Sequence, residues 1–451
     1  MRLFAKIKLI LSLIFIVLVI TLALWLWKGN GNNRILSRKL TKHSSITKPP
    51  PVVLWWTKLL PNYHQTKRCG FNQCTFTVDR KLLNSNGTKV LVFYGSELNK
   101  TDLPLPRQPH HLWALFHEES PKNVPFIQYP RVLKHFNITS TFSRYSNFPL
   151  TTQYIKSEKE LTDRKYLVAI GTKSLLRETE NLAPVAFVQS ICDTSSGRNE
   201  YVKELMKHIQ VDSYGGCLHN KDLPKELTGD YLNSIQSEEF YRFFARYKFI
   251  IAYENGVCND YISEKFWRPL VMGNIPIYYG SPTIKDWEPT KKSVIYISDF
   301  TSPKALADYL KRLDANDHEY NTYLDHKYSM LHPITNDLLK TTLLDRDFES
   351  NNEFELFECF ICNRLHDDSF HSIADASHYD CGGSSAGGVN NRLQFPSMET
   401  SMVHSDWHSI MAMGRCEASV LDVLLQRNTN FTELEFEDML QQDIKTTKCR
   451  L

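Results

Sequence analysis

Residues 249–282 decide the fold, and they read Phe-Ile-Ile-Ala-Tyr-Glu-Asn-Gly-Val-Cys-Asn-Asp-Tyr-Ile-Ser-Glu-Lys-Phe-Trp-Arg-Pro-Leu-Val-Met-Gly-Asn-Ile-Pro-Ile-Tyr-Tyr-Gly-Ser-Pro. The apolar run 249–252 is typical of a buried strand, and 275–279 predicts a second strand. Between them, 261–272 carry apolar residues at helical spacing and stop at Gly273. The pattern predicts a strand–helix–strand unit of a parallel sheet.

In parallel sheets, ligands bind outside the carboxyl ends of the strands. At that edge the sequence places Glu254, Asn255, Tyr261, Glu264 and Lys265. The last two are expected in the first helical turn. A carboxylate there can hold ribose hydroxyls, and an ammonium beside a helix N-terminus can hold a diphosphate. We therefore expect a nucleotide-binding edge.

The same stretch resembles the donor-sugar motif of the α-1,3/4-fucosyltransferases, glycosyltransferase family 10. That motif runs Phe-Glu-Asn-Ser, a short gap, then Asp-Tyr-Ile-Thr-Glu-Lys, and closes on a Pro-containing strand and Gly-Pro. The resemblance extends from about Val53 to about Cys362. The residues at 258–270 are similar to those of one divergent branch, the tenth and eleventh members of the animal α-1,3-fucosyltransferases. The alternative is a generic Rossmann-like unit in which Glu264 and Lys265 form a surface pair.

Alternating strands and helices in both halves of the 451 residues predict two α/β domains. The resemblance implies the GT-B fold, in which an acceptor-side domain and a nucleotide-sugar domain face a cleft. The expected parts are a cytoplasmic tail (1–8), a transmembrane anchor (9–27), a stem (28–51), the acceptor-side domain (52–162), the GDP-fucose-binding domain (163–363) and a C-terminal tail (364–451). In this tail, 380–388 is predicted as a flexible linker and Ser419–Leu440 as helical.

Residues 9–27 contain no charge, and as a helix they would span about 28 Å, roughly the hydrocarbon core of a membrane. A cleaved signal peptide is the alternative, but no small-residue cleavage site follows Trp27. All ten cysteines and four glycosylation sequons lie after this span, the sequons at Asn86, Asn99, Asn137 and Asn430. We expect a single-pass Golgi membrane protein with a lumenal catalytic part, or alternatively one of the endoplasmic reticulum. A net charge of +3 gives no indication of a nucleic-acid partner.

Moving a sugar off a nucleotide requires a base for the incoming hydroxyl and stabilisation of the departing diphosphate. Asp345-Arg-Asp347 is the only Asp-x-Asp sequence; it follows the donor motif and is interpreted as a solvated surface run. Basic residues are therefore expected to stabilise the diphosphate, with no essential metal. Lys265 is one candidate. Arg198, which precedes a Tyr-Val-Lys-Glu-Leu helix, is the other, because the resemblance places it on the donor phosphates.

The base is sought in the segment Phe116-His-Glu-Glu-Ser-Pro121, which follows a predicted strand. The family has a Glu-Ser-Pro-like stretch here, and its glutamate is the catalytic base, which falls on Glu119. Glu118 and His117 are the alternatives. Further along, Ser143-Arg-Tyr-Ser146 resembles an Arg-rich turn of the family near the acceptor site.

The cysteines include two close pairs, Cys69 with Cys74 and Cys359 with Cys362. Two such pairs could bind zinc, but disulfides are favoured in an oxidising lumen. The resemblance implies that the N-terminal pair bonds with the late Cys-x-x-Cys. It leaves the state of Cys258 open.

The sequence as a whole predicts an inverting fucosyltransferase that uses GDP-fucose. Glu119 would act as the base, Arg198 and Lys265 would hold the leaving group, and Glu264 would hold the ribose. The expected acceptor is N-acetylglucosamine of a glycan, in α-1,3 linkage, or a glycoprotein. The alternatives are O-fucosylation of folded secreted protein modules and a degenerate, membrane-anchored glycan-binding protein.

Overall fold

The computed structural model describes residues 49–57, 61–192, 194–229, 234–344, 352–379, 381, 401–446 and 449, without the side chains of 401–406. The predicted cytoplasmic tail and anchor, the stem up to residue 48, the run 345–347 and residues 380 and 382–388 of the predicted linker lie outside these residues. In the part of the chain that is described, no helix combines the length and apolar character needed to cross a membrane. Nearly all described residues belong to one compact unit, Pro50–Leu451.

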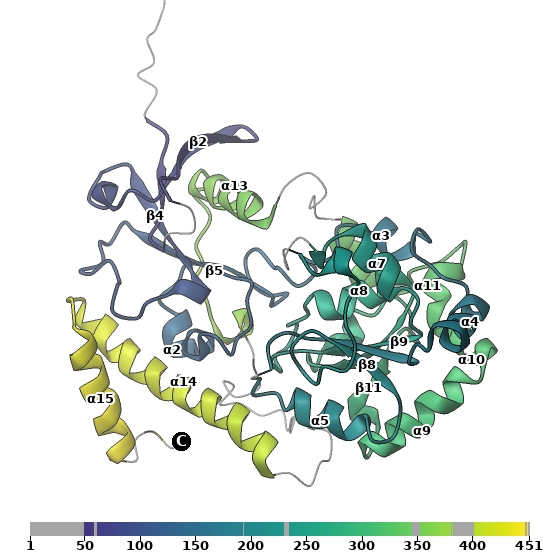
Figure 1. Cartoon of the computed structure of the whole chain (residues 1–451). Coiled ribbons are helices and arrows are strands. Elements are labelled where there is room, and N and C mark those ends of the chain that lie inside the picture. The colour runs from purple at the N-terminus through teal and green to yellow at the C-terminus, as the bar shows by residue number, and fades with distance from the viewer. Residues whose placement is uncertain are drawn as a thin grey trace, which may run out of the picture. The chain divides into compact units, whose positions relative to one another are not determined.

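The first sheet has six strands in the order β2-β3-β1-β4-β5-β6 (Figure 1). Its strands are β1 Val52–Trp55, β2 His64–Cys69, β3 Asn72–Thr77, β4 Thr88–Tyr94, β5 Leu112–His117 and β6 Ile138–Thr141. Only β2 pairs antiparallel, with β3 at one edge. The central β4 is a nearly continuous apolar run because both faces of a parallel sheet are covered.

The second sheet is parallel, with the order β11-β10-β9-β7-β8. Its strands are β7 Val185–Val188, β8 Val211–Tyr214, β9 Phe249–Tyr253, β10 Ile275–Tyr279 and β11 Ile295–Tyr296. Helix α8, Glu264–Met272, connects β9 and β10 and confirms the predicted unit. The helix begins later than residue 261 because Ser263 is its N-cap, and it ends where Gly273 adopts φ 74°.

The remaining helices lie between and after the strands of the two sheets, and α14 and α15 are the last elements among the described residues. The α-helices are α2 Pro130–Leu133, α3 Glu158–Thr162, α4 Ile170–Glu180, α5 Arg198–Leu205, α7 Glu238–Phe244, α9 Pro303–Asp314, α10 Asp317–Asn321, α11 Asp325–Tyr328, α12 Asp337–Leu344, α13 Glu353–Leu365, α14 Ser401–Arg427 and α15 Glu433–Lys445. The 3₁₀ turns are η1 Arg80–Leu82, η2 Gly95–Glu97, η3 Pro125–Gln128, η4 Lys225–Leu227, η5 Ile284–Asp286, η6 Ile297–Asp299, η7 Thr322–Leu324 and η8 Ala376–His378.

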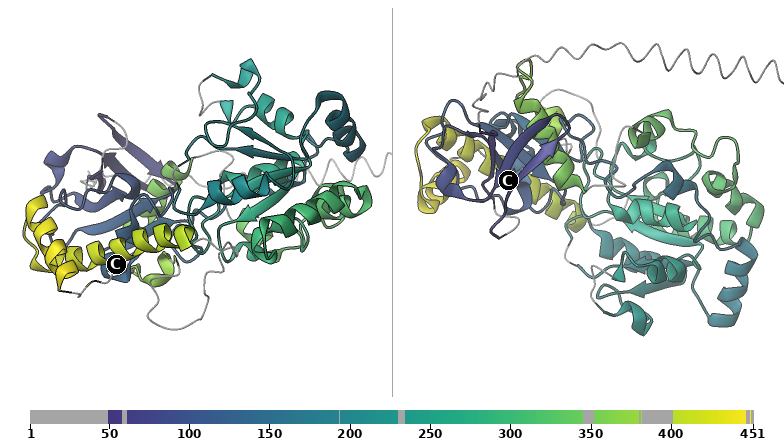
Figure 2. Two further views of the ribbon diagram at one scale, coloured as in Figure 1. Left: turned by 60° about the horizontal axis from the view of Figure 1, so that its bottom comes forward. Right: turned by 90° about the horizontal axis from the view of Figure 1, so that it is seen from above.

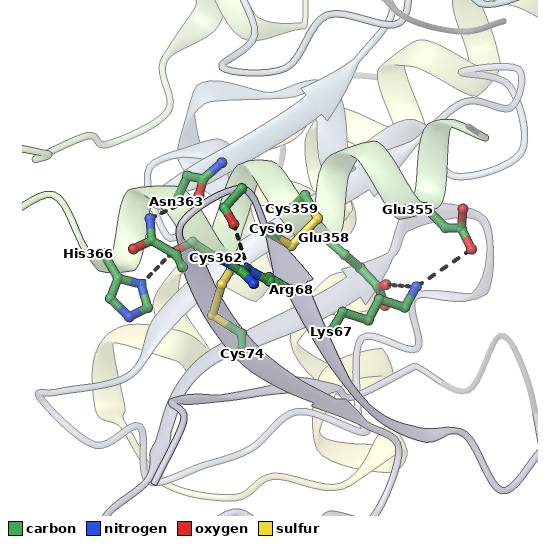
Figure 3. Close-up of a disulfide and its surroundings, with 12 residues drawn as sticks. Lys67, Arg68, Cys69, Cys74, Glu355, Glu358, Cys359, Cys362, Asn363 and His366 are labelled. Carbon is green, nitrogen blue, oxygen red and sulfur yellow. Dashed lines mark hydrogen bonds and ion pairs between the residues drawn. A yellow bond between two sulfur atoms is a disulfide. The ribbon is translucent and has the colours of Figure 1, made fainter. Parts of the chain in front are cut away.

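Helix α13 is fastened to the edge of the first sheet by two disulfides. Cys359 bonds to Cys69 on β2, and Cys362 bonds to Cys74 on β3 (Figure 3). Next to Cys359, the buried Glu358 of α13 accepts hydrogen bonds from Trp55, Tyr63 and Lys67. The late Cys-x-x-Cys therefore returns to the beginning of the folded chain.

In the described part of the C-terminal tail, two α-helices, α14 and α15, stand where one was predicted. Helix α14 begins well before Ser419, and the prediction of an unbroken helix to Leu440 is wrong. The chain turns at Asn428, which has φ 54°, and Thr432 caps α15. Helix α14 lies along η3 and α2. Helix α15 folds back beside α14, and both are yellow in Figure 2. A disulfide between Cys416 and Cys449 joins the end of the chain to α14.

Candidate active site

Glu254 connects the end of β9 to the start of α8. Its side chain is fully buried and accepts hydrogen bonds from the Ser263 backbone nitrogen at 2.7 Å and the Ser263 hydroxyl at 2.6 Å. The same hydroxyl caps the helix by accepting from the backbone nitrogen of Lys265. Burial raises the pKa of Glu254. Glu254 therefore supports the donor-side helix from within the protein.

Glu264 and Lys265 form an ion pair in the first turn of α8. The Lys265 Nζ lies 3.0 Å from a Glu264 carboxylate oxygen, and the two side chains are 15% and 24% exposed, respectively. Burial by itself raises the pKa of Glu264, but the charges of Lys265 and Arg268 lower it to about 2. The pKa of Lys265 is raised because the carboxylates of Glu264 and Glu254 outweigh its burial. Both groups are thus charged at neutral pH at a helix N-terminus, where an anion is favoured.

Arg198 is the first residue of α5 and is completely buried. One guanidinium nitrogen donates to the Asn255 Oδ1 at 2.7 Å and to the Tyr253 carbonyl at 3.3 Å, and the other donates to the Ile191 carbonyl at 2.7 Å. Its Nε finds no partner among the described residues. Burial lowers the pKa of Arg198 to about 10, so the group stays cationic at neutral pH. A buried cation with a spare donor is suited to an anionic ligand.

Three candidate bases follow one another at the carboxyl end of β5. Glu119 is exposed, whereas Glu118 is half-buried and accepts a hydrogen bond from the Tyr94 hydroxyl at 2.7 Å. Burial raises the pKa of Glu118 to about 7. His117 is enclosed, its Nδ1 lies 2.9 Å from the Tyr379 hydroxyl, and burial lowers its pKa to about 3. Of the three, Glu119 has the carboxylate most accessible to an acceptor.

The Tyr154 hydroxyl is influenced by carboxylates of both candidate regions, Glu119 after β5 and Glu264 on α8. Desolvation of its hydroxyl, followed by the negative charges of Glu264 and Glu119, raises the pKa of Tyr154 above its ordinary value. Glu119 follows a strand of the first sheet and Glu264 begins the helix between two strands of the second sheet, and both charges influence this phenol. Tyr261 packs its ring against Phe142, with centroids 4.9 Å apart.

Sequence reasoning missed the importance of Asp260. This residue is buried with φ 62° and accepts hydrogen bonds from the Arg144 guanidinium at 2.5 and 2.9 Å and from the Trp287 indole at 2.9 Å. Arg144 belongs to the Arg-containing turn after β6, so an ion pair joins that turn to the donor loop, residues 254–263. Both residues stand in motifs that the sequence offered, but nothing in the sequence pairs them.

In the described residues, the one grouping of metal-type ligands is Cys74, Cys362 and His366. Its two cysteines bond to each other, so this grouping offers no thiolate pair to an ion. The donor-side residues combine the cations of Arg198 and Lys265 with the carboxylate of Glu264. Cations there could neutralise a diphosphate directly.

Two family models match the chain. The model described as "Glycosyltransferase family 10 (fucosyltransferase) C-term" matches residues 179–378, and "Fucosyltransferase, N-terminal" matches residues 48–154. "Alpha-(1,3)-fucosyltransferase B" of Drosophila melanogaster is 43% identical over 421 residues, which cover 92% of this chain and 93% of that protein. The Homo sapiens "GDP-fucose protein O-fucosyltransferase 3" is 42% identical over 407 residues, which cover 87% of this chain and 83% of that protein. A solved structure, "Crystal Structure of alpha1,3-Fucosyltransferase with GDP-fucose", aligns at 15% identity with a TM-score of 0.36, over 67% of this chain and 93% of that one.

Proposed function

Because the chain belongs to glycosyltransferase family 10 and is a fucosyltransferase, we propose that it moves fucose from GDP-fucose, with inversion, to a hydroxyl of a glycan or glycoprotein. The observation that carries the donor assignment is the buried Arg198, held by Asn255 at the end of β9. The charged Lys265 at the start of α8 supports the same assignment. Finer aspects of the fold, two domains of the GT-B type facing a cleft, belong to the same proposal.

On the donor side, Arg198 and Lys265 neutralise the negative charge that grows on GDP as the glycosidic bond breaks. Glu264, charged and beside Lys265, is assigned to the ribose hydroxyls. Asn255 and Tyr261 shape the donor pocket. Glu254 contributes indirectly, because its buried carboxylate holds the Ser263 cap. This arrangement requires no essential metal.

On the acceptor side, Glu119 is assigned as the general base. The acceptor oxygen attacks the anomeric carbon of fucose from the face opposite GDP. A bond forms between that oxygen and the carbon, the bond to the diphosphate oxygen breaks, and Glu119 takes the acceptor proton. One displacement of this kind inverts the anomeric configuration.

Two acceptor classes follow from the relatives. The name of the fly relative supports an α-1,3 linkage, which the sequence prediction placed on N-acetylglucosamine. The name of the human relative supports a protein hydroxyl, the predicted alternative of folded secreted modules. The third possibility, a glycan-binding protein without activity, is disfavoured because Glu119 and Lys265 are both present.

We also propose that the protein is anchored by residues 9–27 in the Golgi membrane, with the endoplasmic reticulum as the alternative, and that its folded part is lumenal. The five disulfides among the described residues support an oxidising compartment. Membrane fractionation and glycosidase treatment of the protein made in cells test this proposal. A soluble protein whose gel mobility is unchanged by the glycosidase would contradict it.

The function is tested by incubating the purified full chain with radiolabelled GDP-fucose and three acceptors: free N-acetyllactosamine, an N-glycan core peptide and folded disulfide-bonded modules. We expect transfer to at least one of them. The matched control is Glu119→Gln, which should bind GDP as the wild type does and transfer nothing. If the wild type binds GDP and transfers to none of the acceptors, the binding-protein alternative replaces the proposal.

A further inference from the structure

Trp407 on α14 reaches the donor loop and the segment that follows Glu119. The indole is 1% exposed. A Cβ atom added to Gly256 would lie 2.9 Å from the Trp407 Cη2 and 3.2 Å from the Pro121 Cγ. Gly256 of the donor loop, residues 254–263, thus lies next to both Pro121 and a helix of the C-terminal tail.

Helix α14 is itself fixed to the segment that carries Glu119. A Cβ added to Gly414 would lie 2.6 Å from the Cβ of Pro125, so the helix backbone lies directly on η3. The Tyr129 hydroxyl donates to the Met411 carbonyl, and the Gln128 amide lies 2.8 Å from the Met411 sulfur. Because these contacts lie within ten residues of Glu119, α14 and the predicted base form one packed unit.

A second connection joins the C-terminal region to the donor loop. Cys258 in that loop forms a disulfide with Cys381. Just before it, the Tyr379 hydroxyl contacts His117 at the end of β5, and the His378 carbonyl accepts a hydrogen bond from Thr141 on β6. The residues that follow α13 therefore hold both the donor loop and the strands of the acceptor side.

We propose that Trp407 is a positioning residue of the transfer reaction, fixing the donor loop against the segment that carries the base. The proposal rests on the proposed role of Glu119. The donor and the base come from different sheets, so their separation depends on what is packed between them. A displacement of about 1 Å between reacting groups is enough to lower a rate by about 100-fold. A rigid, buried ring that packs on the donor loop, carried by a helix fixed to the base segment, limits such a displacement.

The indole ring of Trp407 contributes by packing and not by hydrogen bonding. Among the described residues no group accepts a hydrogen bond from the Trp407 Nε1. Packing is then the property that matters, so phenylalanine should replace tryptophan well and alanine should replace it badly. Val423 offers a matched control, because it lies on the same helix and is 43% exposed.

The test measures kcat, the KM for GDP-fucose and the Kd for GDP in full-length Trp407→Ala, Trp407→Phe and Val423→Ala. We expect Trp407→Ala to lose at least tenfold in kcat, while its KM and Kd change less than threefold. Trp407→Phe should stay within threefold of the wild type, and Val423→Ala should match it. A Trp407→Ala protein with a lowered melting temperature but wild-type kcat would overturn the proposal.

A double-mutant cycle of Gly256→Ala and Trp407→Phe tests the proposal without the Trp407→Ala protein. Gly256→Ala adds a methyl group against the indole and should lower kcat at least tenfold. The shorter ring of Trp407→Phe leaves room for that methyl group, so the double variant should regain at least threefold. Additive losses would overturn the proposal. The wild-type rate tests the proposed function alone, whereas the ratios of variant to wild-type rates test Trp407 alone.

Discussion

Glu118 should impose a pH dependence on stability that Glu118→Gln removes. Burial raises the pKa of this carboxyl from 4.5 to about 7, so the folded state binds the proton more tightly than the unfolded state. The resulting loss of stability is absent below pH 4.5, grows as the pH rises and is complete above about pH 7. At about 1.4 kcal/mol per pKa unit, ionisation of a fully enclosed carboxyl with this shift would lower the free energy of unfolding by about 3 kcal/mol. Because Glu118 is only half-buried, we expect about 1–2 kcal/mol.

The free energy of unfolding in urea, measured at pH 5 and pH 8, checks this value. Glu118→Gln should lose the pH-dependent difference, since the Tyr94 hydroxyl can still donate to the glutamine carbonyl. Glu119→Gln is the comparison variant and should keep most of the difference, because the charge of Glu119 contributes less than burial to the raised pKa of Glu118. An unchanged pH dependence in Glu118→Gln would refute the argument from burial.

The same two variants decide which carboxylate is the base. Glu119→Gln should keep its affinity for GDP and lose turnover, while Glu118→Gln should remain active. The opposite result would transfer the role to Glu118, whose pKa of about 7 is well suited to a general base. If both variants are active, neither carboxylate is essential.

Three further predictions concern the donor site, metal dependence and glycosylation. Lys265→Ala and Arg198→Ala should each weaken GDP binding and raise the barrier to transfer by about 2–4 kcal/mol, and near-normal kinetics would show that the diphosphate lies elsewhere. Treatment with EDTA should leave most activity, and complete loss restored by manganese would contradict stabilisation by basic residues. Asn137→Gln should leave gel mobility unchanged, because the Asn137 side chain already accepts from Arg107 and Trp113 and donates to the Ser372 carbonyl. Replacement of each of the other three sequon asparagines, all exposed, should increase mobility.

The strand–helix–strand unit was predictable because its signals are local. The apolar run of β9, the helical spacing of α8 and the stop at Gly273 all lie within one short stretch. Each of these features follows from neighbours along the chain. Residues that act at the carboxyl edge of a parallel sheet could be proposed for the same reason.

Contacts between distant segments could not be predicted in this way. The sequence left Cys258 open because its partner, Cys381, is 123 residues away in a stretch rich in glycine and serine. The ion pair between Arg144 and Asp260 joins two motifs that are 116 residues apart, and no sequence pattern links them. The break between α14 and α15 was also missed, because apolar residues continue at helical spacing on both sides of Asn428.

Glu254 shows why residue type and position do not by themselves assign a role. The sequence predicted that this carboxylate, like the neighbouring Asn255, belongs to the donor-binding edge. In the structure Asn255 holds Arg198, while Glu254 is fully buried and directs both carboxylate oxygens to Ser263. The difference arises because successive residues at a strand end point in opposite directions. One residue therefore orients Arg198, the cation proposed to bind the diphosphate, and its neighbour orients the helix that carries Lys265.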